Sequence, residues 1–442
     1  MISSREKPSA VRVLVVCPTE YGGQIEHAAD TAMACATDPR VQQVVLLSRP
    51  GANAYLGVPA MPKLRVVETI PPRRPANSRV VTRALQVLDL AVEHVRVRKL
   101  SRLAGPNTIL ALDSTKYPMP RLLAGHRQQR LALFLHNVKP HHDQASPSFR
   151  ERVLGSLERG ALKGVDRVIV HGCDQLRTAR TLVAGDLLAV ALPTSTRIDE
   201  LATQASVPVS VDGDTSVQSA PNAQSGEQVD LNALTAEPYA LVLGELRANK
   251  GVELAIAAAG LAQVPMLVAG KSESPDLGHA LATLAQEAGT VSVVDRFLER
   301  QEFNRVLERA SVVVLPYTHF DAQSGILAKA VAAGLPIVAS DLASLKEQAS
   351  GHSPSSFADV HDTEAFAAAL RHAFDRAVGD DLTHSNPGRQ SAVHAEQGPE
   401  TKDDHSDWDP TVEAVIGTVR SDSGASARGR TPAMYRRSGR SQ

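Results

Sequence analysis

The stretch YALVLGELRANKG, residues 239–251, decides the fold, because an apolar run of strand length gives way to a polar cluster that ends in glycine. An apolar helical pattern follows directly. The same change recurs further along, in MLVAGK (266–271), SVVVLPY (311–317), DAQSGIL (321–327) and AAGLPIVASD (332–341). Apolar strands that end at glycine or polar clusters and open into helices are typical of a parallel sheet, which presents ligands at its strand ends.

A second series of this kind precedes the stretch. The apolar run VRVLVVCP (11–18) is followed by Gly22, Gly23 and a helical pattern, and the run VQQVVLLS (41–48) completes a strand, helix, strand unit that packs into parallel sheets. Further predicted strands lie at 64–67, 108–112, 131–135 and 165–170. We therefore expect an α/β fold with two doubly wound domains, at residues 10–202 and 238–378.

Three other segments differ from the domains in composition. Residues 203–237 are rich in Ser, Gln, Asn, Asp and Pro without a sustained period, which predicts a flexible linker or insertion. Residues 379–407 are predicted to be disordered, and residues 422–442 form a basic tail that we also expect to be unstructured. Between them, residues 408–421 carry a short helical pattern introduced by Trp408, the only tryptophan.

The composition limits the class of protein. A formal net charge of -1 over 442 residues argues against a nucleic-acid binder. The three cysteines are too few and too scattered for a disulfide framework or a zinc cluster, so a reducing cytoplasm is the simplest setting. No apolar run approaches the roughly 18 to 20 residues that span a bilayer, and the first residues lack the apolar core of a signal peptide.

The order of these motifs and their residues resemble the GT-B glycosyltransferases, specifically the retaining glycosyltransferase family 4, also called glycosyl transferases group 1. That family carries a strand, then Arg and Lys-Gly, a glycine-ended strand, a proline-ended strand, an acidic or Ser-Gly loop and an A-x-G-x-P-x-V-A-S-D segment. The resemblance covers nearly all of the chain outside its linker and tail, and its most specific motifs lie in the C-terminal half.

The resemblance implies two Rossmann-like domains that face each other across a cleft, with the acceptor on the first and the nucleotide-sugar donor on the second. The helix at 408–421 is then expected to cross back to the first domain. The implied reaction transfers a sugar, with retention, to a carbohydrate or lipid-linked acceptor. Members of this group need no metal or other cofactor, so side-chain cations and helix N-termini stabilise the departing diphosphate.

Two segments of the second domain are expected to bind that diphosphate. Arg247 and Lys250 follow directly on a strand, and they offer a planar fork and a point charge to a phosphate. The alternative is an ordinary polar loop. Gln323, Ser324 and Gly325 precede an apolar helix, where their backbone N–H groups can cradle a phosphate. Ser324 is equally a plain helix N-cap, and the two roles are compatible.

The chain departs from the family's pair of glutamates separated by seven residues. Alignment on the segment KAVAAG places Asp321 and Lys329 at these positions, whereas alignment on Gly325 places Ala322 and Ala330 there. Either way the second carboxylate, which grips the nucleotide ribose in the family, is missing. We expect a divergent branch in which Asp321 contacts the donor sugar or is an exposed loop acid, and in which Lys329 lies on the helix surface.

The first domain offers a second set of candidates. The resemblance places the loop at Gly22 and Gly23 near the donor phosphate, and without a full G-x-G-x-x-G fingerprint it does not indicate a nicotinamide cofactor. Glu26 and His27 are predicted to be surface residues. His136 ends the apolar run LALFLHN at a place where the family often has a histidine near the sugar, so we expect either a catalytic or a structural histidine.

Three further positions are weaker candidates. Gly270 ends a strand, and Glu347 lies where the family frequently has an acid close to the nucleotide, so both are expected to border the donor pocket. For Glu347 the alternative is a solvated helix residue. His141 and His142 follow His136 in a loop that could reach the acceptor, but their spacing does not indicate a metal site.

The stretch from Arg73 to Arg102 interleaves basic residues with Val, Leu and Ala. A basic amphipathic helix can lie on an anionic membrane surface, and family members with lipid-linked acceptors often dock in this way. The alternative is a solvated helix face with its apolar side in the core. Peripheral contact with the inner face of the membrane is therefore an expectation alongside the cytoplasmic location.

These observations favour a glycosyltransferase that uses a nucleotide-sugar donor. Two alternatives stay open. A nucleotide-sugar epimerase of the same fold would need an acid and a base beside the sugar, for which His136 and Asp321 are the obvious candidates. A catalytically silent scaffold would keep the fold and lose the donor site, which the missing carboxylate favours and the intact Arg247 and Lys250 oppose.

Overall fold

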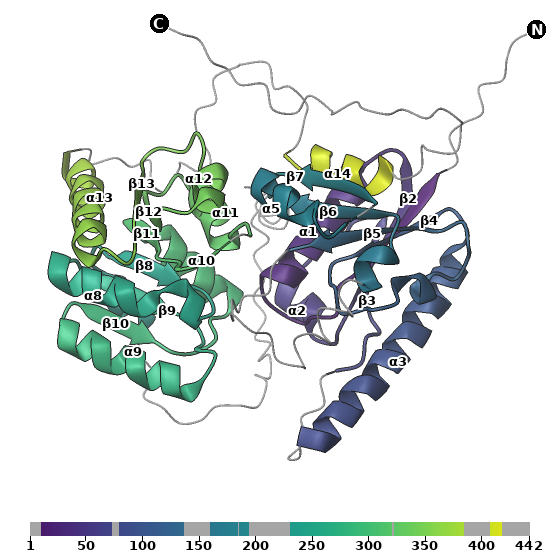
Figure 1. Ribbon diagram of the computed structural model, residues 1–442, viewed down its shortest axis with the longest axis horizontal. Coiled ribbons are helices and arrows are strands. Elements are labelled where there is room, and N and C mark those ends of the chain that lie inside the picture. Colours follow the sequence, from purple (N-terminus) through teal and green to yellow (C-terminus); the bar gives the residue numbers. More distant parts are fainter. Residues whose placement is uncertain are drawn as a thin grey trace, which may run out of the picture.

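The computed structural model describes residues 10–72, 79–136, 160–183, 185–193, 230–320, 322–383 and 407–417. These residues form two α/β domains, each built on one parallel sheet with helices packed against it (Figure 1). The predicted fold class of two doubly wound domains is therefore confirmed.

The first domain contains a seven-stranded sheet in the order β3-β2-β1-β4-β5-β6-β7. Its strands are β1 Val11–Val16, β2 Val41–Ser48, β3 Leu64–Glu68, β4 Thr108–Leu112, β5 Arg130–Leu135, β6 Arg167–His171 and β7 Asp186–Val190. Its helices are α1 Gly23–Thr37, α2 Ala52–Leu56, α3 Arg79–Ala104 and α5 Gly172–Ala179, with a 3-10 turn at Pro120–Leu123.

The second domain contains a six-stranded sheet in the order β10-β9-β8-β11-β12-β13. Its strands are β8 Ala240–Leu243, β9 Met266–Ala269, β10 Val291–Val294, β11 Val312–Leu315, β12 Ile337–Ser340 and β13 Ser355–Ala358. Its helices are α7 Leu231–Leu234, α8 Val252–Ala262, α9 Pro275–Ala288, α10 Arg300–Glu308, α11 Gly325–Ala332, α12 Ala343–Gln348 and α13 Thr363–Thr383, with a 3-10 turn at Ala248–Lys250.

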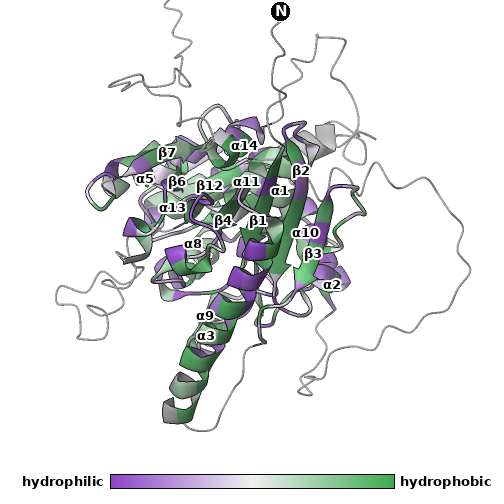
Figure 2. Cartoon of the chain, turned by 90° about the vertical axis from the view of Figure 1, so that its right-hand side faces the viewer, coloured by the Kyte–Doolittle hydropathy of each residue, from purple (hydrophilic) through white to green (hydrophobic). Residues whose placement is uncertain are grey.

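The apolar runs form strands because both faces of each sheet are covered. Strands β4, β8 and β11 are buried along their whole length, as expected for parallel strands between helical layers. Figure 2 shows β1 and β2 coloured mainly as hydrophobic. Each domain has two core clusters, which contain residues from opposite faces of its sheet.

Each sheet has one point at which the strand order reverses. In the first domain the chain runs outward from β1 to β3 and then returns to place β4 on the other side of β1. In the second domain the same reversal lies between the neighbouring strands β8 and β11. Open parallel sheets bind ligands outside the carboxyl ends of the two strands at such a reversal. The segments after β1, β4, β8 and β11 are therefore where a site is expected.

The C-terminal helix α14, Asp409–Ile416, packs on the first domain, where Figure 1 shows it in yellow. It contacts α1, β4 and β7, and its Trp408 and Val415 side chains are buried in the first domain's core. Arg167 also donates a hydrogen bond of 2.8 Å to the carbonyl oxygen of Ala414. The chain thus returns from the second domain to the first, as the crossover prediction requires.

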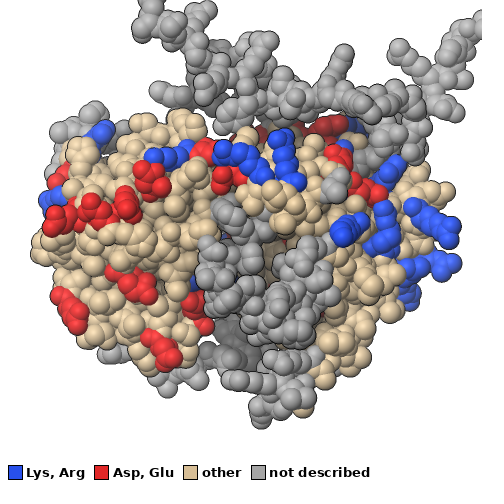
Figure 3. Space-filling view, in the orientation of Figure 1, with Lys and Arg blue, Asp and Glu red and all other residues tan. Residues whose placement is uncertain are grey.

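Helix α3 projects from the first domain in both views (Figures 1 and 2). Its Glu93 and Val97 side chains are fully buried, whereas Val87, Val95 and Leu103 are mostly exposed. Figure 3 shows Lys and Arg side chains gathered on the side of the molecule where α3 lies in Figure 1. The expected membrane contact stays a prediction, which co-sedimentation with anionic vesicles would test. Arg73 lies outside the described residues.

Among the described residues, no helix is both long and apolar enough to cross a bilayer.

The domain limits differ from the expectation at two places. Helix α7 lies inside the stretch predicted as linker, and its Leu231 side chain packs into the core of the second domain. Helix α13 continues to Thr383, past the predicted boundary at 378, because no proline interrupts its helical pattern there. Most of the predicted linker, of the segment at 379–407 and of the basic tail lies outside the described residues.

Gly270 is required by the packing of two strand ends, and this gives a test of the fold. Its φ is +148°, and an added Cβ would lie against the carbonyl oxygen of Gly244, well inside van der Waals contact. We expect Gly270→Ala to lower the free energy of unfolding of the second domain by about 2 to 5 kcal/mol in guanidinium titrations followed by circular dichroism.

The matched control is Gly289→Ala, because Gly289 also has a positive φ, +70°, but an added Cβ there meets nothing within 4 Å. This variant is expected to lower the free energy of unfolding by about 1 kcal/mol, because it introduces backbone strain alone. Equal losses in the two variants would show that the close approach at Gly270 is not what the fold requires.

Candidate active site

The carboxyl edges of the two sheets face each other, and side chains of the second domain contact the first. Lys329 Nζ lies 3.4 Å from Glu26 Oε2. The Oε1 atom of Gln323 accepts a hydrogen bond of 2.7 Å from the backbone N–H of Leu192. Arg300 also donates to the carbonyl oxygen of Leu56. The candidates of both domains therefore border one interdomain space.

Lys250 lies at the strand reversal of the second sheet, as its position after β8 predicts. Its Nζ lies 5.1 Å from the centre of the Tyr317 ring, which follows β11. It makes no ion pair within the part of the chain that the structure describes. Arg247, three residues earlier, pairs at 2.5 Å with Glu245 in a half-exposed ion pair. Exposed pairs of this kind contribute about 0 to 1 kcal/mol, so an anionic ligand can displace Glu245 at small cost.

The N-terminus of α11 lies beside these cations. The Ser324 hydroxyl caps the helix by accepting from the N–H of Leu327, and it also lies 3.1 Å from the Tyr317 hydroxyl. Gln348 holds the same residue from α12, because its Oε1 accepts from the N–H of Ser324 and its Nε2 donates to the carbonyl oxygen. In the expected phosphate cradle, the Ser324 hydroxyl caps α11 and the Ser324 N–H donates to Gln348. Gly325, the first residue of the helix, is exposed.

Lys329 is not on the free helix surface, which corrects the expectation for this residue. Only 15% of its side chain is exposed, and it pairs with Glu26, which is equally buried. The Tyr55 hydroxyl donates a hydrogen bond of 2.7 Å to Glu26 Oε1. The expectation that Glu26 is a surface residue is therefore also wrong. A lysine of the second domain thus binds a carboxylate of the first.

Glu347 and Gln323 both serve the contact between the domains. The Glu347 carboxylate accepts hydrogen bonds from the backbone N–H groups of Cys173, at 2.6 Å, and Asp174, at 3.1 Å. These are free donors in the first turn of α5, where a negative charge is stabilising. An added Cβ at Gly172 would collide with the Gln323 side chain. The side chains of both residues are thus engaged with the first domain in this arrangement.

The two predicted glycine sites have different environments. Gly22 has a φ of +89°, and an added Cβ at Gly22 or Gly23 would meet nothing within 4 Å, so this loop leaves open space at the reversal of the first sheet. Gly270 instead packs against the backbone of Gly244. Its conformation is accounted for by strand packing without a ligand.

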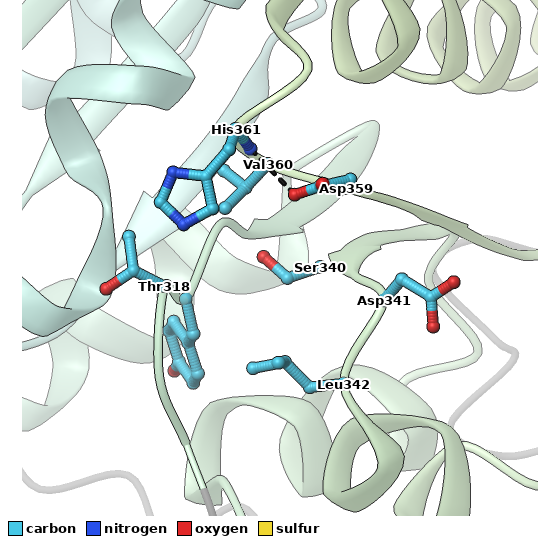
Figure 4. A pocket seen from close by; sticks show the side chains of 8 residues that line it. Thr318, Ser340, Asp341, Leu342, Asp359, Val360 and His361 are labelled. Atoms are coloured by element: carbon cyan, nitrogen blue, oxygen red, sulfur yellow. Dashed lines mark hydrogen bonds between the residues drawn. The ribbon is translucent and has the colours of Figure 1, made fainter.

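A cavity of about 320 Å³ lies at the carboxyl edge of the second sheet. It is lined by the segments that follow three neighbouring strands: Tyr317, Thr318, Ser340, Asp341, Leu342, Asp359, Val360 and His361. Figure 4 shows the Thr318, Leu342 and His361 side chains around this space, with Asp341 pointing away from it. Because Tyr317 is shared with Lys250 and Ser324, the cavity adjoins the expected diphosphate position.

His136 belongs to a buried cluster at the reversal of the first sheet. Asp113 follows β4 and is fully buried, and its Oδ1 lies 2.7 Å from His136 Nε2 and 3.0 Å from His27 Nδ1. His27 is 7% exposed, so the expectation that it is a surface residue is wrong. Burial by itself lowers the pKa of His136, but the charge and hydrogen bond of Asp113 outweigh it and raise that pKa.

The pKa values of the other groups in the cluster are shifted in the opposite direction, downward. Burial would raise the pKa of Asp113, but the two histidines overcome this and lower it to about 2. Burial lowers the pKa of His27 in spite of Asp113. Burial, together with the two neighbouring imidazoles, lowers the pKa of His171 well below its ordinary value. The cluster therefore holds one carboxylate, and only His136 among its histidines is favoured in the charged form.

Sequence reasoning did not identify Asp113 or His171, although both had a signal. Asp113 directly follows the strand at 108–112, and His171 ends the strand after that of His136. Polar residues at the ends of neighbouring parallel strands converge at one edge of the sheet. Asp113, His136 and His171 could therefore have been grouped from the sequence. The predicted Asp321, together with His141 and His142, lies outside the described residues.

Comparisons with known proteins agree with this architecture. Residues 237–376 match the family model of glycosyl transferases group 1. The chain is similar to the sucrose-phosphate synthase of Thermosynechococcus elongatus, with a TM-score of 0.59 at 16% identity, over 83% of this chain and 90% of that one. No curated protein sequence matches the chain.

Two further solved structures have the same fold. HepE of Anabaena, in complex with UDP and glucose, aligns with a TM-score of 0.52 at 14% identity, over 84% of this chain and 91% of that one. The trehalose 6-phosphate synthase of Burkholderia multivorans aligns with a TM-score of 0.52 at 13% identity, over 85% of this chain and 92% of that one. The chain therefore has the GT-B fold, and the resemblance to glycosyl transferases group 1 is confirmed for residues 237–376. Family 4 in particular stays a prediction.

The Asp113 carboxylate gives a test of the cluster. We expect Asp113→Asn to lower the free energy of unfolding at pH 7 by about 1 to 3 kcal/mol, because two buried imidazoles lose their charged partner. The folded-state pKa of Asp113, about 2, is below its ordinary 3.8, so this stabilisation is complete above roughly pH 4 and is lost as the pH falls through 2. Denaturant titrations of wild type and variant should therefore converge on acidification.

Asp186→Asn is the control, since Asp186 is a half-exposed partner of Arg167. This substitution is expected to lower the free energy of unfolding by less than about 1 kcal/mol. A gap between wild type and Asp113→Asn that stays constant from pH 7 to pH 2 would contradict the assigned charge of the cluster.

Proposed function

We propose that this protein is a glycosyltransferase that moves a sugar from a nucleotide-sugar donor to a carbohydrate or lipid-linked acceptor. The observation that carries the proposal is the position of Lys250, which lies at the strand reversal of the second sheet without an ion pair among the described residues. The family match over residues 237–376 supports the same assignment. A cation at this place suits a ligand with a concentrated negative charge.

In the proposed reaction the second domain binds the nucleoside diphosphate. Lys250, Arg247 and the backbone N–H groups at the start of α11, near Gly325, would stabilise the charge that develops as the diphosphate leaves. The nucleotide would occupy the adjoining cavity beside Tyr317. We propose that this half of the reaction needs no metal, because protein cations take the role that a metal ion has elsewhere.

The acceptor would enter from the first domain. His136 lies 28% exposed at the end of β5, and the raised pKa favours its cationic form beside the sugar. We propose that the acceptor hydroxyl attacks the anomeric carbon from the face that the diphosphate leaves, which retains the configuration. The contacts of Glu347, Gln323 and Lys329 hold the two domains together around this space, which favours transfer over hydrolysis by excluding water.

Binding of nucleoside diphosphates tests the proposal. Calorimetric titration with UDP, GDP, ADP and TDP should show that wild type binds one of them, and UDP comes first because the similar HepE structure contains it. The double variant Arg247→Ala/Lys250→Ala should weaken that binding at least about 100-fold, since two charge-assisted contacts of about 1.5 to 3 kcal/mol each are lost.

Arg371→Ala is the control, because Arg371 pairs with Asp375 on the exposed side of α13. It should bind the nucleotide like wild type. Binding of none of the four nucleotides would reject the donor site and favour a silent scaffold. Release of an epimerised nucleotide sugar without any acceptor would instead establish an epimerase.

A further inference from the structure

Three histidines of the first domain converge on one point. They are His27 in the first turns of α1, His136 directly after β5, and His171 at the end of β6. One ring nitrogen of each lies within 4.8 Å of those of the other two. We propose that these three side chains bind a divalent transition-metal ion of the zinc type. This inference goes beyond the proposed function, which places the diphosphate in the other domain.

The spacing of the rings fits a tetrahedral ion. The ring centre of His27 lies 4.8 Å from that of His136 and 5.0 Å from that of His171, and the third separation is 5.6 Å. Three imidazoles bound at the usual Zn–N distance of about 2.0 to 2.1 Å have their ring centres roughly 5 Å apart. The separations of the ring centres therefore match those of three imidazoles that share one ion.

The buried nitrogens of the cluster need a partner. The Nε2 atom of His27 is buried and has no hydrogen bond to any residue that the structure describes. His171 is 3% exposed, and within the same part of the chain neither of its ring nitrogens makes a hydrogen bond of normal geometry, although the backbone of Val190 lies nearby. A buried polar atom without a partner costs about 1 to 3 kcal/mol. A bound ion would satisfy these lone pairs, and core histidines without a ligand would not.

Asp113 orients two of the three ligands. It contacts Nδ1 of His27, so the unpartnered Nε2 is the atom that remains for the ion. It contacts Nε2 of His136, so Nδ1 remains there. A carboxylate on the second nitrogen of a metal-binding histidine is the usual arrangement, because it fixes the ring and increases its basicity. The same carboxylate offsets part of the ion's charge in a buried setting.

The donor set selects the kind of ion. Three imidazole nitrogens suit zinc and its neighbours, whereas calcium and magnesium require oxygen ligands. His27 and His171 are buried but His136 is 28% exposed, so the site opens on the side of the interdomain space. A fourth position is thus available to water or to an oxygen of a substrate. Coordination requires a neutral imidazole, so binding of the ion releases the proton that His136 carries in the proposed reaction, and the ion then takes its place as the cation opposite the diphosphate site.

Metal titration of the full chain tests the proposal. Protein treated with a chelator and then dialysed should bind one Zn²⁺ per chain by calorimetry, and Co²⁺ should give the intense visible absorption of a tetrahedral centre. His171→Gln should weaken Zn²⁺ binding at least about 100-fold, since a direct ligand is removed. Asp113→Asn should weaken it about 10- to 100-fold, the usual effect of losing a partner of a metal ligand.

A control separates this site from other histidines. The variant His126→Ala should bind Zn²⁺ like wild type, because His126 bonds to the carbonyl oxygen of Arg102 away from the cluster. Circular dichroism confirms that each variant is folded. Binding of fewer than one ion per chain, or unchanged binding in both His171→Gln and Asp113→Asn, would overturn the proposal.

The nucleotide titration keeps the two proposals distinguishable. Arg247→Ala/Lys250→Ala should lose nucleotide binding and keep Zn²⁺ binding, because both residues lie in the other domain. Loss of Zn²⁺ binding in that variant would contradict a site made by the first domain alone.

Discussion

The reversal of strand order in each parallel sheet is the constraint on which the rest of the structure depends. Where the chain leaves β1 for one side and later returns to β4 on the other, the loops after these strands diverge and leave room for a ligand. The same geometry separates the loops after β8 and β11. Asp113 and Lys250 lie at these two places. Backbone topology therefore positions the proposed chemistry before any side chain is considered.

The contacts between the domains bring these two edges together, and several of them are made by charged or polar side chains. The Glu347 carboxylate binds the first turn of α5, and Lys329 pairs with Glu26. Such contacts are weaker than a large apolar interface and can exchange partners when a charged ligand enters. Lys329 thus has a structural account here, as the partner of Glu26.

The fold could be predicted from the sequence because the strands are continuous apolar runs that end at glycine or polar residues. β8, β9, β11 and β12 all show this pattern. β7, Asp186–Val190, was not predicted, because it is short and only partly buried and so carries a weak signal. The boundary of the second domain was placed at 378, before the end of helix α13, because a shift in composition locates a boundary only approximately.

The position of the cations in the fold was predicted, whereas the burial of His27 and the groups around it were not. Arg247 and Lys250 follow a strand within a recognisable motif, so their edge of the sheet was predictable. The burial of His27 was not, because it depends on Asp113, Phe134 and Trp408, which come from distant parts of the chain. The role of Lys329 likewise depends on a carboxylate in the other domain. Local sequence cannot show contacts of this kind.

A crystal structure of the protein with a bound nucleoside diphosphate tests the central claim most directly. The account predicts the diphosphate at the strand reversal of the second sheet, within hydrogen-bonding distance of Lys250 Nζ and beside the start of α11, facing the histidine cluster. A diphosphate bound away from both groups, or its absence from this edge at a saturating concentration, would contradict the account.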